Sequence, residues 1–89
     1  MELDEYLKNF REQIDTLDHE IIYLLSRRFI IVEQIGLIKK DIGAESIQPK
    51  RWEELMYKVL EEAKDKHLSE DLVKKIWNLI HKESLKIEK

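Results

Sequence analysis

The 89-residue sequence has no cysteine, two glycines, one proline and no apolar run that approaches the ~20 residues of a membrane span. The lack of cysteine excludes disulfides and thiolate metal sites as a means of stabilising a short chain. The shortage of glycine and proline disfavours strands joined by tight turns and favours long helices. Because so short a chain buries a limited core, we expect oligomerisation to supply further apolar contacts.

Charge is plentiful but mixed in sign. The chain has 16 basic and 19 acidic residues, a net charge of −3, and the two kinds are interleaved. A nucleic-acid-binding chain typically carries a segregated basic tract, so we expect no nucleic-acid partner. The N-terminus, from Met1 to Glu5, is acidic where a signal peptide is basic. We therefore expect a cytoplasmic protein that does not engage a membrane.

Apolar residues recur in steps of three and four through the first part of the chain, with one charged residue among them. This seam consists of Leu3, Leu7, Phe10, Ile14, Leu17, Ile21, Leu24, Arg28, Ile31, Ile35 and Ile38. The spacing predicts one helix from about residue 4 to about residue 42, ended by Gly43. A helix of this length spans roughly 60 Å, which is too long for a compact monomer, so a second chain is expected to lie along it.

Two shorter helices are predicted in the remainder. Pro49 suits the first position of a helix that ends near Lys66. Ser69 is a good N-cap for a third helix that runs almost to the C-terminus, with Glu70 and Asp71 in its first turn. The predicted fold class is therefore all-α, with three helices per chain, one long and two shorter, in a single domain of residues 1–89.

Several polar residues interrupt the apolar pattern. Arg28 is the one charged member of the seam, where it either binds an anion or fixes the register of a coiled coil. Lys39 follows eleven residues later, within about 20° of Arg28 around the helix and ~16 Å along it, although it could also be a solvated lysine. Arg11 lies ~25 Å before Arg28, so it could reach the same ligand only from an antiparallel second chain. Ser84 and Glu88, four residues apart, continue the apolar stripe of the third helix unless that end frays.

Neither a metal site nor a covalent nucleophile is indicated. His19, His67 and His81 lack metal-ligand spacing and are expected at the surface. The serines lack the partners of a nucleophile motif. We expect no metal and no cofactor.

Taken in order, these segments resemble the all-helical chorismate mutases over essentially the whole chain. The resemblance rests on Phe10-Arg11-Glu12-Gln13-Ile14-Asp15, Leu17-Asp18, Ile21-Ile22, Leu24-Leu25, Arg28, Ile35-Gly36-Leu37-Ile38-Lys39, Pro49-Lys50-Arg51 and Glu83-Ser84. It implies an intertwined homodimeric helical bundle with two sites. It also implies a cofactor-free Claisen rearrangement of chorismate, a small dicarboxylate, to prephenate in phenylalanine and tyrosine biosynthesis.

The resemblance also implies roles for individual residues. Arg28 would bind one substrate carboxylate, and Arg11 of the other chain would bind the second. Lys39 would contact the ether oxygen and a carboxylate, while Arg51 and Ser84 would hold and shape the site. The expected catalytic residues are Arg28, Lys39 and Glu88, and the substrate-binding residues are Arg11, Arg28, Lys39, Gln48, Arg51, Ser84 and Glu88.

The sequence departs from that family at a few positions. The family usually has Gln at the position of Glu88, which donates to the ether oxygen, and some members have Glu. An ionised Glu88 cannot donate, so acidification should raise activity, although nearby Lys39 opposes protonation. Trp52 replaces a Glu that accepts from the substrate hydroxyl, so either Gln48 or Glu53 takes that role or turnover falls. Trp52 could instead form a hydrophobic staple with Ile47. Gln48 replaces a common Asp, which weakens the N-cap.

Gly36 lies inside the first helix, at a cost of ~1 kcal/mol relative to Ala; close helix packing is the expected reason, and direct substrate contact is the alternative. Two other functions remain open. One is isochorismate pyruvate lyase, which shares the fold and much of the cation set. The other is a weakly active regulatory or interaction module, or a plain dimeric coiled coil, which Trp52 favours.

Overall fold

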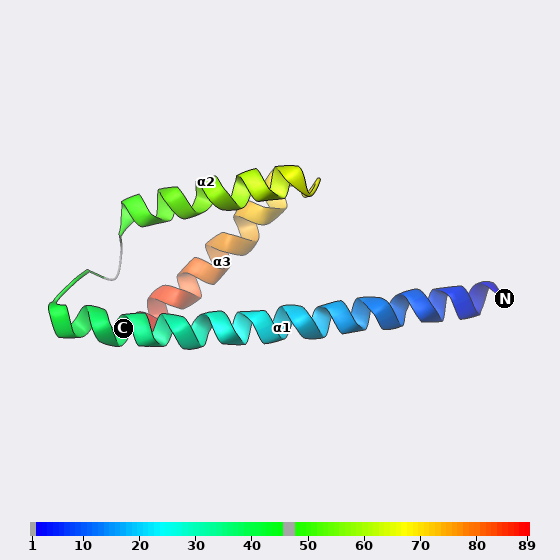
Figure 1. The fold of residues 1–89 in the computed structure, drawn as a ribbon, viewed down its shortest axis with the longest axis horizontal. Coiled ribbons are helices and arrows are strands. Elements are labelled where there is room, and N and C mark those ends of the chain that lie inside the picture. The colour runs from blue at the N-terminus through cyan, green and yellow to red at the C-terminus, as the bar shows by residue number, and fades with distance from the viewer. Residues whose placement is uncertain (1, 46–47) are drawn as a thin grey trace. The chain divides into compact units, whose positions relative to one another are not determined.

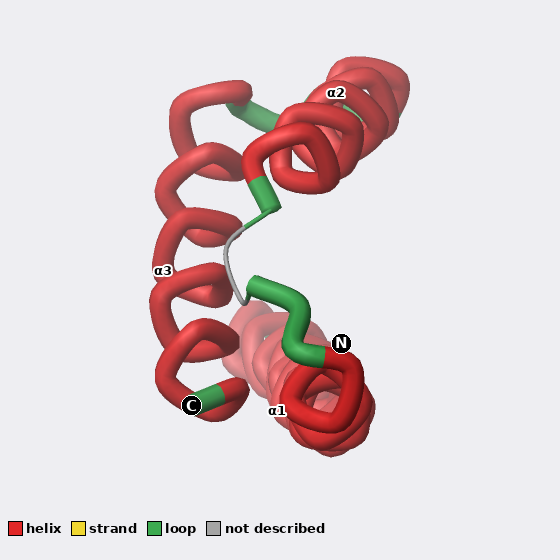
Figure 2. The backbone as a smooth tube through the Cα atoms, turned by 90° about the vertical axis from the view of Figure 1, so that its left-hand side faces the viewer, coloured by secondary structure: helices red, strands yellow, loops and turns green. Residues whose placement is uncertain are grey.

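The fold was analysed in a computed structural model that describes residues 2–45 and 48–89. It contains α1 (Leu3–Ile42), α2 (Pro49–Asp65) and α3 (Glu70–Glu88), as Figure 1 shows. Within the described ranges every other residue lies in a loop or turn, and there is no strand (Figure 2). The predicted all-helical class and the one-long, two-short layout are confirmed.

Local signals set the helix ends. Gly43 has a φ of +71° just after α1, and the N–H of Ala44 donates to the carbonyl of Lys39 at 2.8 Å. This is the left-handed glycine termination that the sequence predicts. At the start of α3 the Ser69 side chain accepts from the Leu72 N–H at 3.2 Å, which confirms the N-cap. Gln48 precedes Pro49 in an extended conformation, and its side chain makes no cap bond.

The end of α2 uses the same termination without a glycine. His67 has a φ of +59°, and the Leu68 N–H donates to the Ala63 carbonyl at 2.8 Å. The His67 N–H donates to Lys64 at 3.2 Å, which completes the pair of bonds typical of this motif. A residue with a Cβ is strained in the left-handed region, so His67 stores conformational energy at this corner.

The chain divides into two units, and the boundary between them lies within α1, after Ile31. The first unit holds the N-terminal part of α1, and none of its described residues is fully buried. Its apolar seam residues are between 41% and 71% exposed: Leu3, Leu7, Phe10, Ile14, Leu17, Ile21, Leu24 and Ile31. An apolar stripe of this extent is typical of a surface that another element covers.

The second unit starts at Val32 and contains α2 and α3. These two helices pack on each other, and Ala63, Val73 and Ile80 are buried there. Near the start of α2 the Trp52 ring stacks on His81 of α3, with 4.2 Å between ring centroids and 25° between the ring planes. His81 is half-buried, so the expectation that all three histidines lie at the surface is wrong for this one. It is wrong because an aromatic partner covers the imidazole.

Within the second unit the C-terminal part of α1 has a covered face that differs from the seam. Val32 and Gly36 are buried there, whereas Ile35 and Ile38 are 41% and 60% exposed. A Cβ added to Gly36 would lie 2.9 Å from the Cα of Glu88 and 3.3 Å from its carbonyl oxygen. The prediction that Gly36 allows close helix packing is therefore confirmed.

Among residues 2–45 and 48–89, no helix combines the length and the apolar composition that crossing a membrane requires.

Replacing His67 with Gly should raise the free energy of unfolding by about 1 kcal/mol, because glycine adopts the left-handed conformation without the Cβ clash. Denaturant unfolding at a fixed protein concentration measures the change. The His67→Ala variant is the control: it keeps the Cβ and should gain little. An equal gain in both variants would place the effect in the lost imidazole instead of the backbone.

The Gly36→Ala substitution should destabilise the protein by about 1–2 kcal/mol, since the new methyl group meets the Glu88 backbone and overpacking outweighs the ~1 kcal/mol of helix propensity gained. Thermal unfolding followed by circular dichroism measures the shift in Tm. A higher Tm in Gly36→Ala, as helix propensity alone requires, would contradict the close approach of α1 and α3.

Candidate functional site

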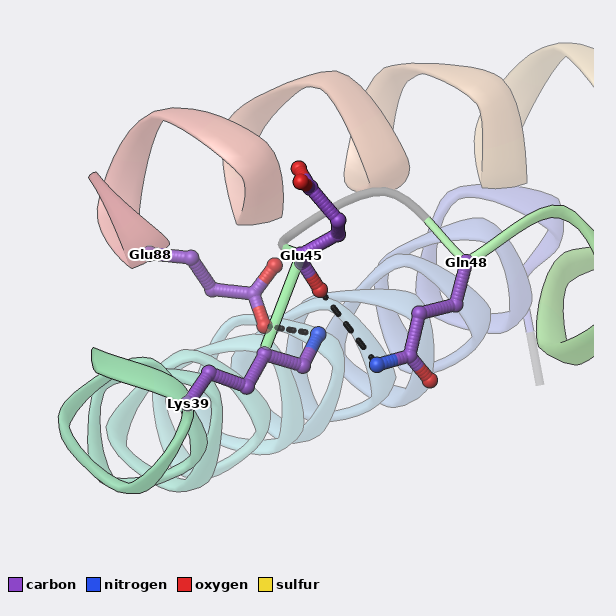
Figure 3. Close-up of polar contacts among 4 residues, drawn as sticks. All are labelled: Lys39, Glu45, Gln48 and Glu88. Carbon is purple, nitrogen blue, oxygen red and sulfur yellow. Dashed lines mark hydrogen bonds and ion pairs between the residues drawn. The ribbon is translucent and has the colours of Figure 1, made fainter. Parts of the chain in front are cut away.

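In the second unit a sheltered ion pair joins α1 to α3. Lys39 Nζ donates to Glu88 Oε1 at 2.8 Å, and the two side chains point toward each other from their helices (Figure 3). Their side chains are only 18% and 8% exposed. An ion pair this sheltered is screened less by solvent than a surface pair.

The macrodipoles of α1 and α3 help to explain why Lys39 and Glu88 pair. Lys39 lies in the last turn of α1, where the macrodipole favours a cation. Glu88 is the last residue of α3, where the same effect disfavours an anion, and the Lys39 ammonium compensates. Because α3 extends to Glu88 and this residue is buried, the alternative that the helix end frays is not supported.

Ser84 lies one turn before Glu88 and is also buried. Its hydroxyl donates to the Ile80 carbonyl at 2.8 Å, a bond along the same helix that satisfies the polar group inside the packed face. Ile80, Ser84 and Glu88 therefore form one buried stripe. The sequence prediction that polar residues continue the apolar stripe of this helix is confirmed.

Gln48 and Arg51 flank the start of α2, and both are exposed. The Gln48 amide donates to the backbone carbonyl of Glu45 at 3.3 Å, so it turns back toward the α1–α2 connection (Figure 3). Glu53, the other candidate acceptor for a substrate hydroxyl, is also exposed. The structure thus leaves the side chains of Arg51 and Glu53 accessible to a ligand.

Arg11 and Arg28 belong to the first unit. Arg11 is exposed, while Arg28 is half-buried, in keeping with its position on the seam. Their expected roles toward a ligand remain predictions.

Trp52 is half-buried through its stack on His81. The proposed staple partner, Ile47, lies outside the described residues. Sequence reasoning missed His81 as the residue that Trp52 contacts. The available signal was its position four residues after Trp77 and next to Ile80, beside the buried stripe of α3.

A grouping of three or more histidine, cysteine or acidic side chains that could hold a metal ion does not occur in the part of the chain that the structure describes. The chemistry that the second unit offers is that of a sheltered ammonium group beside a carboxylate and a hydroxyl, set in apolar helix faces. Such an arrangement can bind and polarise an oxygen-rich small molecule.

Comparison with known proteins identifies the family of the chain. A sequence model described as "Chorismate mutase type II" matches residues 10–89, which include parts of both units. Over 84 residues the chain is 32% identical to a protein named T-protein from Haemophilus influenzae. That alignment covers 94% of this chain but 22% of the relative, so the chain spans about a fifth of the relative's length. Since the family match extends over nearly the entire sequence, the chain belongs to the type II chorismate mutase family.

Proposed function

We propose that the chain catalyses the Claisen rearrangement of chorismate to prephenate. The observation that carries the proposal is the sheltered Lys39–Glu88 contact between α1 and α3, in a chain that belongs to the chorismate mutase family. The resemblance assigns Lys39 to the ether oxygen and a carboxylate of the substrate. The low exposure of this ammonium supports that role, because fixed donors act most strongly where water is excluded.

The chemistry requires little beyond binding and electrostatics. Chorismate is a dianion that must lose water and fold into a compact chair, and arginine guanidiniums suit its carboxylates. As the C–O bond breaks, negative charge grows on the ether oxygen, so a fixed cation there stabilises the transition state more than the ground state. No covalent intermediate or added group is needed for this isomerisation.

The proposal includes a second copy of the chain. Arg28 would bind one carboxylate and Arg11 of the second copy the other, with Gln48, Arg51 and Ser84 around the ligand. The exposed seam of the first unit supports an antiparallel homodimer, since apolar residues at regular helical spacing are otherwise left in water. Trp52 is engaged with His81, which supports a packing role for it and weakens the argument for an inactive interaction module.

The shared site can be tested by complementation. Arg11→Ala and Lys39→Met should each lower kcat/KM for chorismate by roughly 100-fold or more, because each removes a cation used in the transition state. If the two residues serve one site from different chains, mixing the variants and allowing exchange should restore about a quarter of the wild-type activity. Loss of chorismate absorbance measures the rate.

Lys40→Met is the matched control, because it removes an exposed lysine next to Lys39 and should leave turnover unchanged. Circular dichroism verifies that each variant folds. If the wild-type protein does not convert chorismate faster than the uncatalysed reaction, the proposal of mutase activity is contradicted and a regulatory module is favoured. Turnover without complementation would contradict the shared site alone.

The Glu88→Gln variant tests the role of position 88. An amide can donate to the ether oxygen and a carboxylate cannot, so kcat/KM at pH 8 should be higher in Glu88→Gln than in the wild type. An equal kcat/KM in the two proteins would show that position 88 does not donate to the substrate.

A further inference from the structure

The aromatic pair of Trp52 and His81 joins the start of α2 to α3. The two rings stack with 4.2 Å between their centroids and 25° between their planes, and both side chains are half-buried. Because the rings meet through their faces, the two imidazole nitrogens lie at the edge of the stack. The contact with Trp52 therefore fixes the plane of the imidazole without using its hydrogen-bonding atoms.

His81 lies on the same side of α3 as the buried polar residues of that helix. It precedes Ser84 by three residues and Glu88 by seven. In a helix of 3.6 residues per turn, these spacings place all three side chains within about 60° of one another. His81 is ~4.5 Å from Ser84 along the helix axis, which is about one turn. The imidazole therefore adds a third polar group to the face that carries Ser84 and Glu88.

The other candidate acceptors for a ligand hydroxyl at the start of α2 are less well placed. The Gln48 amide donates to the Glu45 carbonyl at 3.3 Å and so turns toward the α1–α2 connection (Figure 3). Glu53 is exposed and projects about 100° away from Trp52 around α2. Trp52 itself has one N–H donor and no acceptor. A neutral imidazole has one donor and one acceptor nitrogen, either of which can bind a hydroxyl.

We propose that His81 recognises the ring hydroxyl of the substrate and that Trp52 is a positioning residue, which holds the imidazole in its plane. This inference rests on the proposed function and deepens it. The acceptor for the hydroxyl then lies on α3 instead of α2, so an indole is compatible with turnover at position 52, where the resemblance leads us to expect Glu. A neutral acceptor also avoids the repulsion that a carboxylate would exert on a dianionic substrate.

The test compares chorismate with an analogue in which hydrogen replaces the ring hydroxyl. A site that forms a hydrogen bond to a hydroxyl discriminates against a substrate that lacks it. His81→Phe keeps a ring that can stack on Trp52 but has no nitrogen. It should lower the preference for chorismate, measured as the ratio of the two kcat/KM values, by about tenfold relative to the wild type. The ratio does not depend on the fraction of protein that folds, and the intrinsic reactivities of the two compounds cancel between proteins.

Further variants separate recognition of the hydroxyl from packing. His81→Gln loses the stack but keeps an acceptor, so it should retain more of the preference than His81→Phe. Trp52→Leu removes the ring on which the imidazole rests and should lower the preference by about threefold or more, although His81 is still present. Lys82→Leu is the matched control: it changes an exposed residue next to His81 on α3 and should show the wild-type preference.

The outcomes separate this inference from the proposed reaction. Turnover of chorismate with the same preference in the wild type and His81→Phe would overturn the role of His81 and leave the proposed reaction intact. If the wild type does not convert chorismate, the reaction is refuted, and isothermal titration calorimetry with the two compounds tests the inference alone. A preference for chorismate in the Kd values that His81→Phe lacks would then support the role of His81. Equal preferences, or no binding of chorismate, would overturn it.

Discussion

The structure of the second unit depends on the approach of α3 to the C-terminal part of α1. The absence of a side chain at Gly36 allows the Glu88 backbone to come within van der Waals contact, and this closeness places the Glu88 carboxylate on Lys39. Without that approach, two opposite charges near helix ends would lie in solvent, where an ion pair contributes little. The residue without a side chain thus positions the two residues on which the proposed chemistry depends.

Helix existence and helix ends could be predicted because their causes are local. Gly43, Pro49 and Ser69 each act through the backbone of their own neighbourhood, and each lies where the sequence indicates. Contacts between helices were predicted less well. The covered face of α1 beside α3 runs through Val32 and Gly36, one position away from the stronger apolar spacing of the seam. Periodicity identifies the most apolar face of a helix but not the face that a particular neighbour covers.

In the candidate site, too, local features were predicted better than contacts between helices. Ser84 and Glu88 were identified because they continue the apolar stripe of α3, and Lys39 because it lies on nearly the same side of α1 as Arg28. Lys39 and Glu88 are joined by an ion pair. The partner of Trp52 was missed because His81 meets it only when α2 and α3 fold together. The absence of a cap bond from Gln48 followed from residue type alone. Its turn toward Glu45 did not, because that depends on the path of the connection.

The contact between Gly36 and position 88 involves the Cα and carbonyl oxygen of the latter more closely than its side chain. The main chain therefore sets the spacing of α1 and α3 at this point. The functional group of residue 88 can change with little effect on that spacing. Acid and amide side chains of equal length can be exchanged at this position on an unaltered scaffold. The charge carried at this helix end can therefore differ between sequences without repacking the helices.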